Sequence, residues 1–418
     1  MHYGIVIYGS RGDLQPCLAL AVGLSEKGHD VTLLANENFK DFVESCGVRF
    51  VALPGNIEEI VHLPEVLGIL RSGNMIRFFR ELQKITTRLQ PVVNERLLHL
   101  CAVPEVLVAS PLAMIWIYSV AEKLDKKWAI VQLSLPTVPT SEFPFAGLSL
   151  FDFPLYNLIS HRFIRGLYWK LNKKSVNEHR KLISPPVMRE SMIQKISEQR
   201  ILNLYAFSSS LISRPKDWPM EVDITGFLTL PTIARTSYGF EQRDDKLEEW
   251  LQNGESPIYL GFGSIPIPDL AKFAGIVREL LTTTNHRFIF CQGWSQMPDL
   301  PIHERIYVVK SVDHEWLFPQ CKAAIIHGGI GTLAAVLRAK IPVIVVSIFG
   351  DQPLWGKLIE LRRLGFHIPF KKVTASKLTD AMEQSLTNEI TQNAQRVGGM
   401  VGENGVIKTI EKLESYFV

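Results

Sequence analysis

The chain has 418 residues, which is too many for one ordinary hydrophobic core and predicts two domains. Hydrophobic residues make up 46% and charged residues 21%, as in globular proteins, and no apolar run reaches the roughly 18 residues of a membrane-spanning helix. The net charge is only +3, and five scattered cysteines without a C-x-x-C pair argue against a disulfide framework and against a zinc site.

The N-terminus does not resemble a signal peptide, because no basic segment precedes its apolar stretch and Gly9 breaks that stretch. We therefore expect a cytoplasmic protein. Residues 161–200 carry ten Lys and Arg against three Glu, a local balance of about +7. A solvated face is the simplest interpretation, and peripheral contact with an anionic membrane is the alternative. Nucleic acid is not expected, because no groove-reading module is visible.

The first 35 residues read as strand, loop, helix and strand. Residues 3–8 form an apolar β run, apolar residues then recur at helical spacing as far as Gly28, and residues 31–35 form the next strand. This βαβ unit predicts a parallel sheet, to which 105–109 and 129–133 add later strands. Residues 74–100 read as an amphipathic helix with a break at Pro91.

A second series of alternating strands and helices begins near Pro257. The expected elements are strands at 258–261, 287–291, 306–309, 323–326 and 343–347, and helices at 269–283, from Thr332 and from Leu354. Two doubly wound α/β domains facing a cleft are the simplest architecture, with the carboxyl ends of the strands directed to that cleft. A polar stretch at 226–245 predicts a linker between domains 1–225 and 246–397, which leaves 398–418 as a terminal segment.

The most informative stretch of the second domain runs from His327 to Thr332 and reads HGGIGT. It follows a buried strand and opens a helix, where unpaired backbone N–H groups and the positive end of the helix dipole favour a diphosphate. We expect N–H donors at Gly331 and Thr332 and a hydrogen bond from His327 to a phosphate oxygen. A plain tight turn with a core histidine is the structural alternative.

The next strand ends at Phe349-Gly350-Asp351-Gln352-Pro353. An acid beside an amide can accept from and donate to vicinal hydroxyls, which is what holding a hexose requires. A helix N-cap is the alternative for Asp351, but it does not account for Gln352.

Three further loops follow strand ends in the same domain. Ser264, after the first strand, is a candidate phosphate ligand, and Trp294 is a candidate wall for a nucleobase or a packing residue. The backbone near Val312 could hydrogen-bond a uracil or thymine edge.

Together, the HGGxGT run, the GDQP run and the Gly263-Ser264 pair resemble the donor domain of family 1 glycosyltransferases of the GT-B fold. The run from Gly9 to Pro16, GSRGDLQP, is similar to the signature of the branch that holds sterol 3-β-glucosyltransferases and bacterial antibiotic glycosyltransferases. The resemblance covers nearly the whole chain. Residues 1–225 would bind the acceptor, 246–397 would bind the donor, and 398–418 would form a helix that packs back across the domains.

This resemblance implies an inverting transfer that uses a UDP- or dTDP-sugar as co-substrate, with UDP-glucose expected, and that needs no metal or other cofactor. It also implies the donor-site roles of these residues: the diphosphate contacts are Ser264, His327, Gly329, Gly331 and Thr332, and the sugar contacts are Asp351 and Gln352.

The candidate general base is Asp13, because the loop after the first strand has no histidine. An inverting displacement needs a base to take the acceptor hydroxyl's proton. A helix N-cap is the alternative role for Asp13, and the two roles can coexist. Arg11 could screen the diphosphate or fix the loop by an ion pair, while Ser10 and Gly12 would shape the approach of the substrates. Each of the histidines at 62, 99, 161 and 179 reads as a surface or core residue.

The acceptor site is expected in an aromatic region broken by Pro and Gly, whose candidate residues are Phe143, Phe145, Phe151, Phe153, Tyr156 and Trp169. Aromatic walls suit a hydrophobic acceptor such as a sterol, polyketide or flavonoid, and ordinary packing is the alternative.

Three competing functions can be compared with sugar transfer. A nicotinamide oxidoreductase would show G-x-G-x-x-G after the first strand, whereas this loop reads G-S-R-G-D. A sugar-nucleotide epimerase or hydrolase would need its own acid–base pair, which the sequence does not point to. A helper protein that kept the fold and lost catalysis is disfavoured, because Asp13, His327, Asp351 and Gln352 are all present.

Overall fold

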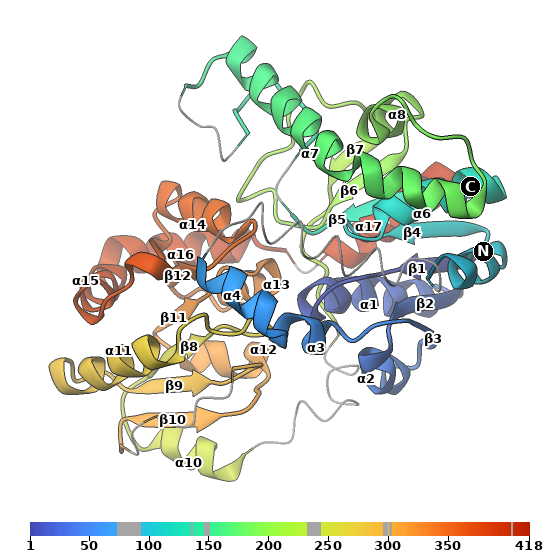
Figure 1. The fold of residues 1–418 in the computed structure, drawn as a ribbon. Helices are drawn as coiled ribbons and strands as arrows, with labels where there is room; N and C mark the ends of the chain where they lie inside the picture. Colours follow the sequence, from blue (N-terminus) through green and yellow to red (C-terminus); the bar gives the residue numbers. More distant parts are fainter. Residues whose placement is uncertain are drawn as a thin grey trace. The chain divides into compact units, whose positions relative to one another are not determined.

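The computed structural model describes residues 1–72, 93–134, 137–145, 151–231, 244–295, 300, 303–402 and 404–418. These residues form two compact units (Figure 1). Unit 1 contains the described residues of 1–57, 80–234 and 402–418, and unit 2 contains those of 58–79 and 235–401. Most of the amphipathic helix predicted at 74–100, and most of the linker predicted at 226–245, lie outside the described residues.

Unit 1 is built on a seven-stranded sheet in the order β3-β2-β1-β4-β5-β6-β7, in which every pairing is parallel. Most of its central strand residues are fully buried, because helices cover both faces of a parallel sheet. The strands are β1 (His2–Val6), β2 (Asp30–Asn36), β3 (Arg49–Leu53), β4 (Val106–Ala109), β5 (Lys127–Gln132), β6 (Leu202–Tyr205) and β7 (Val222–Ile224).

The helices of unit 1 include the longest one in the described chain, α7 (Pro154–Ile183), which packs on α6 (Met114–Leu124). The others are α1 (Arg11–Glu26), η1 (Glu37–Phe39), α2 (Lys40–Ser45), α8 (Met192–Glu198) and α17 (Gly405–Phe417).

The C-terminal helix α17 belongs to unit 1 and packs on α1. The Oγ1 of Thr409 donates to that of Thr225 at 2.7 Å, and Glu414 lies 2.9 Å from the His29 ring. Gly23 makes the close approach possible, because a Cβ at this position would lie 2.5 Å from Cγ1 of Val406.

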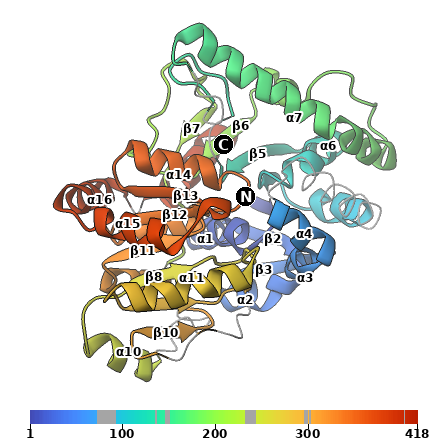
Figure 2. The same cartoon turned by 60° about the vertical axis from the view of Figure 1, so that its left-hand side comes forward.

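Unit 2 carries a six-stranded sheet in the order β10-β9-β8-β11-β12-β13, and it is also entirely parallel. Its strands are β8 (Ile258–Gly261), β9 (Phe288–Cys291), β10 (Ile306–Val309), β11 (Ala323–Ile326), β12 (Val343–Ser347) and β13 (Gly365–Pro369). Helices α11 (Leu270–Thr283) and α15 (Ala375–Ser385) pack together beside this sheet (Figure 2). Helix α13 (Ile330–Arg338) packs with α16 (Asn388–Met400).

The helices of unit 2 include most of α3 (Ile57–His62) and all of α4 (Pro64–Ser72), which precede the rest of the unit in the chain. The remaining ones are α10 (Asp245–Gln252), α11 (Leu270–Thr283), α12 (His314–Leu317), η2 (Phe318–Gln320), α13 (Ile330–Arg338), α14 (Gln352–Leu361), η3 (Phe370–Lys372), α15 (Ala375–Ser385) and α16 (Asn388–Met400).

The two sheets share the doubly wound 3-2-1-4-5-6 strand order, which confirms the predicted fold class. The strand order reverses between β1 and β4 in unit 1 and between β8 and β11 in unit 2. The strands that follow β1 or β8 are added on one side, and those that follow β4 or β11 on the other. Ligands of such sheets bind at the carboxyl ends of these two strands, where the flanking loops diverge. Among the described helices, none combines the length and the apolar character needed to cross a membrane.

We predict that Gly23→Ala lowers the free energy of unfolding by roughly 1–2 kcal/mol, because the new Cβ forces α17 away from α1. The matched control is Gly166→Ala in α7, where a Cβ meets nothing within 4 Å and alanine favours the helix by up to about 1 kcal/mol. Urea unfolding of the two variants and the parent measures the difference. Equal stabilities of the two variants would contradict the close packing of α17 on α1.

Candidate functional site

The loops after β8 and β11 meet at the switch point of unit 2. Gly263 has a left-handed φ of +59°, and a Cβ there would lie 3.3 Å from Cε1 of His327. A side chain at position 263 would therefore crowd the imidazole, and Ser264 comes directly after this contact.

The loop after β9 joins the same group. The backbone N–H of Trp294 donates to the carbonyl oxygen of Gly263 at 3.0 Å, and a Cβ on Gly293 would lie 2.1 Å from that oxygen. The N–H of Gly293 in turn donates to the carbonyl of Lys310 at 3.1 Å, which ties this loop to the segment leading to Val312. Ser264, Trp294 and Val312, predicted separately, thus lie on loops that are bonded to one another.

Trp294 is half-buried, and its carbonyl oxygen lies 3.0 Å from Nε2 of His62, a residue at the end of α3. The two rings are 6.5 Å apart at 52°. His62 and His99 are exposed, whereas His161 and His179 are buried, as expected for surface and core histidines.

His327 is buried, and its Nδ1 has no hydrogen-bond partner among the described residues. Burial, and next the neighbouring His314, lower the pKa of His327 to about 4. The imidazole is therefore neutral at pH 7 and carries a single N–H donor. A Cβ on Gly329 would lie 2.3 Å from Nε2 of His327. Packing against the imidazole therefore requires glycine at position 329.

Helix α13 begins directly after His327 and Gly328, with Gly329 as its N-cap. As at every helix start, the first N–H groups, those of Ile330, Gly331 and Thr332, have no intrahelical partners. No described side chain caps them here. The helix starts two residues earlier than the predicted Thr332, because the extended conformation of Gly329 lets Ile330 enter the first turn. Three N–H groups and a dipole end therefore stand beside a neutral imidazole, an arrangement suited to an anion.

Asp351 and Gln352 lie at the end of β12, and each is held by its neighbours. The Asp351 Oδ2 accepts from Nε1 of Trp355 at 2.8 Å. Burial raises the pKa of Asp351, against the bond from Trp355, which lowers it. The Gln352 Oε1 accepts from the backbone N–H groups of Ile348 at 2.8 Å and Phe349 at 3.2 Å, which leaves its NH₂ group as a donor.

The expected helix is present but starts two residues before Leu354, and the side-chain cap bond considered for Asp351 is absent. Helix α14 starts at Gln352, and Asp351 occupies the N-cap position without a side-chain cap bond, because its carboxylate bonds Trp355 instead. A Cβ on Gly328 would lie 3.4 Å from that of Gln352, so the glycine-rich loop and the Asp351–Gln352 pair are neighbours.

In unit 1 the loop after β1 ends in a capping box. Ser10 is the N-cap of α1, and its backbone N–H donates to Oδ2 of Asp13 at 2.8 Å. The alternative role of Asp13 as the N-cap is therefore wrong. Asp13 is the third residue of the helix, and its carboxylate accepts from the backbone N–H of the N-cap, Ser10. Its carboxylate is held in one orientation, and a Cβ on Gly9 would lie 2.3 Å from Oδ2.

Two neighbours of Asp13 shape this loop. Gly12 is exposed, and its N–H donates to Oγ of Ser10 at 3.2 Å. The Arg11 guanidinium lies over the ring of Phe42, 5.1 Å from its centroid, and so contacts α2.

Sequence reasoning missed three residues that hold the predicted ones. Asn36, at the end of β2, accepts from the N–H of Gly9 at 3.3 Å, and Ser110, after β4, lies 3.4 Å from the N of Tyr8. Trp355 fixes Asp351. The available signals were their places at strand ends and the four-residue spacing from Asp351 to Trp355.

The six candidate acceptor aromatics do not form one wall. Phe143 and Phe145 meet the buried His161 edge to face, at 6.0 and 5.9 Å. A separate cluster at the start of α7 is formed by Phe151, Phe153 and Tyr156. Trp169 lies half-buried on α7.

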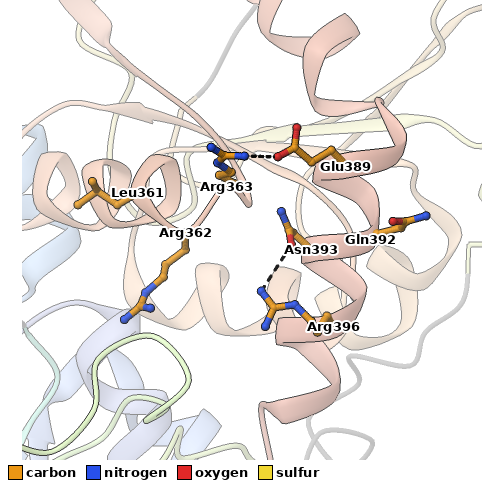
Figure 3. Close-up of a pocket in the computed structure, with 7 residues that line it drawn as sticks. All are labelled: Leu361, Arg362, Arg363, Glu389, Gln392, Asn393 and Arg396. Carbon is orange, nitrogen blue, oxygen red and sulfur yellow. Dashed lines mark hydrogen bonds and ion pairs between the residues drawn. The ribbon is translucent and has the colours of Figure 1, made fainter.

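A shallow hollow in unit 2, shown in Figure 3, is separate from these loops. An ion pair between Arg363 and Glu389 and a 3.5 Å bond from Arg396 to Asn393 cross it. It is formed by residues at the end of α14 and on α16, none of which is a predicted site residue: Leu361, Arg362, Arg363, Glu389, Gln392, Asn393 and Arg396.

Two family models match the chain. Residues 3–139 match the glycosyltransferase family 28 N-terminal domain, and residues 288–401 match the erythromycin biosynthesis protein CIII-like C-terminal domain. The first match contains Asp13 and its loop. The second contains the loops at Trp294, Val312 and His327 and the Asp351–Gln352 pair.

Relatives match almost the whole chain. Sterol 3-beta-glucosyltransferase UGT80A2 of Arabidopsis thaliana is 34% identical over 427 residues, covering 98% of this chain and 65% of the relative. Sterol 3-beta-glucosyltransferase of Yarrowia lipolytica is 29% identical over 433 residues, covering 99% of this chain and 28% of the relative. The chain thus spans less than two thirds of the length of these two relatives.

Solved structures share the architecture. The crystal structure of glycosyltransferase VinC in complex with dTDP has a TM-score of 0.65 at 14% identity, and the match covers 99% of this chain and 100% of that one. At this identity the likeness shows the fold, which is GT-B. The two family models and the relatives show that the chain contains a glycosyltransferase family 28 N-terminal domain and an erythromycin biosynthesis protein CIII-like C-terminal domain, and that it is a homologue of sterol 3-β-glucosyltransferases.

Proposed function

We propose that this protein transfers glucose from UDP-glucose to a hydroxyl of a hydrophobic acceptor, and that this acceptor is a sterol. The transfer inverts the configuration at the anomeric carbon and needs no metal. The observation that carries the proposal is the uncapped N-terminus of α13 beside the neutral His327. Such a site stabilises the negative charge of a diphosphate with uncharged N–H donors. The names of the relatives support the sterol and the glucose, and a flavonoid or polyketide is the alternative acceptor.

In the proposed reaction the Asp13 carboxylate accepts the proton of the acceptor hydroxyl as its oxygen attacks the anomeric carbon. The bond from that carbon to the diphosphate oxygen breaks, and the leaving diphosphate takes the negative charge. Ser264, His327 and the N–H groups of Ile330–Thr332 stabilise this charge, which is where electrostatic catalysis acts most strongly. Asp351 and the NH₂ group of Gln352 bind the sugar hydroxyls, and the loops at Trp294 and Val312 bind the nucleoside.

A transfer assay read by mass spectrometry tests the whole proposal. UDP-glucose and dTDP-glucose are each offered with a sterol, a flavonoid and a polyketide alcohol. We expect a sterol product one hexose heavier from UDP-glucose, unaffected by a chelator. A product from dTDP-glucose alone would support the dTDP-sugar alternative. No product with any pair, with UDP binding intact, would support a helper protein without catalysis.

We predict that His327→Gln weakens UDP binding by about 10- to 100-fold, because a hydrogen bond to a charged group contributes roughly 1.5–3 kcal/mol. Isothermal titration with UDP measures the change. The matched control is His286→Gln, a half-buried histidine of unit 2 outside these loops, which should leave UDP affinity unchanged. Parent-like affinity in His327→Gln would remove this residue from the diphosphate site.

We predict that Asp13→Asn lowers kcat by about 10²–10⁴-fold, the usual contribution of a general base. UDP affinity should stay within twofold, because the amide oxygen can still accept from Ser10 and keep the capping box. Asp41→Asn, at an exposed carboxylate of α2, is the control and should be fully active. An active Asp13→Asn enzyme would exclude Asp13 as the base.

We predict that Asp351→Asn lowers kcat/KM for UDP-glucose by about 10-fold or more and leaves UDP affinity unchanged, because UDP lacks the sugar. Trp355→Phe removes only the N–H that orients Asp351 and should cause a smaller loss in the same direction. Steady-state kinetics and UDP titration separate the two quantities. Equal loss of UDP affinity in Asp351→Asn would instead place this residue at the nucleotide.

A further inference from the structure

Helix α7 leaves a row of large apolar side chains open to solvent. Four of them recur every fourth residue and are between 43% and 64% exposed: Leu155, Ile159, Phe163 and Leu167. Each four-residue step shifts the side chain by about 40°, so this row winds over roughly 120° of the helix surface. The opposite side is buried and includes His161, Val176 and His179. One side of α7 therefore belongs to the core of unit 1, and the other carries apolar side chains that the described residues leave exposed. An exposed apolar row of this length is unusual on a globular protein and marks a binding surface.

Exposed cations accompany the apolar row along the helix: Arg162, Lys170, Lys173, Lys174 and Lys181. The 30 residues of α7 contain one carboxylate, Glu178, which lies 3.7 Å from Nζ of Lys174. Two other cations of the helix serve the fold, because Arg180 pairs with Glu122 at 2.9 Å and Arg165 donates to the carbonyl of Ile193 at 2.7 Å. The exposed side of α7 is thus apolar and cationic at once.

Aromatic side chains gather where α7 begins. Phe151 is 59% exposed and Phe153 is 49% exposed, and both rings pack on Tyr156 with centroids 5.3 and 5.7 Å away. Both views show the N-terminal end of α7 projecting beyond the sheet of unit 1 (Figures 1 and 2). Aromatic residues at such an end favour the boundary between lipid headgroups and acyl chains.

We propose that this side of α7 docks on the surface of an anionic lipid bilayer, with the apolar row inserted at the headgroup boundary and the cations against lipid phosphates. An amphipathic helix with apolar and basic residues on one exposed side lies in the plane of such a surface. The row from Leu155 to Leu167 covers 12 helical steps, or about 18 Å, along the helix axis.

A second copy of the chain fits this surface less well than lipid does. A two-fold interface brings the same surface of both copies together, so the cations of one α7 would face the cations of the other. Like charges brought together in this way oppose association, whereas lipid phosphates are complementary to them. An ordinary solvated basic face would account for the lysines but not for the apolar row between them.

Flotation of the full chain with vesicles tests the proposal, without donor or acceptor and therefore independently of sugar transfer. The vesicles are phosphatidylcholine alone or phosphatidylcholine mixed with phosphatidylglycerol. We expect binding to the mixed vesicles that weakens with added salt, and much weaker binding to the neutral ones.

Two variants separate the apolar and the charged contributions. Lys170→Gln/Lys173→Gln/Lys174→Gln should weaken binding on the order of a hundredfold, since each lysine near an anionic surface contributes about fivefold. Ile159→Ser/Phe163→Ser should weaken binding at least about tenfold. The matched control is Met220→Ser/Leu361→Ser, which removes side chains that are 90% and 80% exposed elsewhere and should bind vesicles as the parent does.

Circular dichroism and thermal unfolding verify that each variant is folded. The proposal is overturned if the parent does not float with anionic vesicles, if neutral vesicles bind it equally well, or if folded α7 variants bind as the parent does. It is also overturned if sedimentation shows a dimer that Ile159→Ser/Phe163→Ser dissociates, because the surface would then serve a second copy.

Discussion

The start of helix α13 is the constraint on which the rest of the candidate donor site depends. A helix whose N-cap is glycine has no side-chain oxygen to satisfy its first N–H groups, and these must find partners elsewhere. Helix α11 of the same unit solves the problem with Asp269, and α1 of unit 1 solves it with Ser10 and Asp13. Of these three helices, only α13 lacks a side-chain cap bond, and its first N–H groups are therefore suited to an anion. The neutral His327 adjoining it offers one more donor without the cost of desolvating a buried charge.

Glycines make this end accessible by letting backbone segments come closer than a Cβ allows. Gly263 lies against the His327 ring, Gly293 against the carbonyl of Gly263, and Gly328 against Val345 beside Gln352. The loops after β8, β9, β11 and β12 are therefore joined into one group around the imidazole. The same physical reason holds for Gly9, which touches the Asp13 carboxylate in unit 1. In both units the site is positioned by the carboxyl ends of parallel strands, where the strand order diverges.

The sequence was sufficient for the fold class and for the motifs of unit 2. Buried parallel strands are continuous apolar runs, so 258–261, 323–326 and 343–347 were predicted with the bounds of β8, β11 and β12. What failed were helix starts, since these depend on side-chain bonds that a pattern does not reveal. The Asp351 carboxylate accepts a hydrogen bond from Trp355 and does not cap α14. The N-cap of α1 is Ser10, although the sequence also allowed Asp13 in this role. The apolar row of α7 was also missed, because periodicity shows which residues share a face but not whether that face is covered.

The proposed nucleotide site and the proposed lipid-binding surface of α7 are compatible with each other. The proposed acceptor is a lipid-soluble alcohol, which an enzyme docked on a bilayer can reach. The central claim is that the donor diphosphate binds the uncapped end of α13. Amide hydrogen exchange with and without UDP tests it most directly. The account predicts that UDP slows exchange at Ile330–Thr332, and leaves the start of α11, capped by Asp269, unchanged. Protection by UDP at other loops with none at Ile330–Thr332 would contradict it.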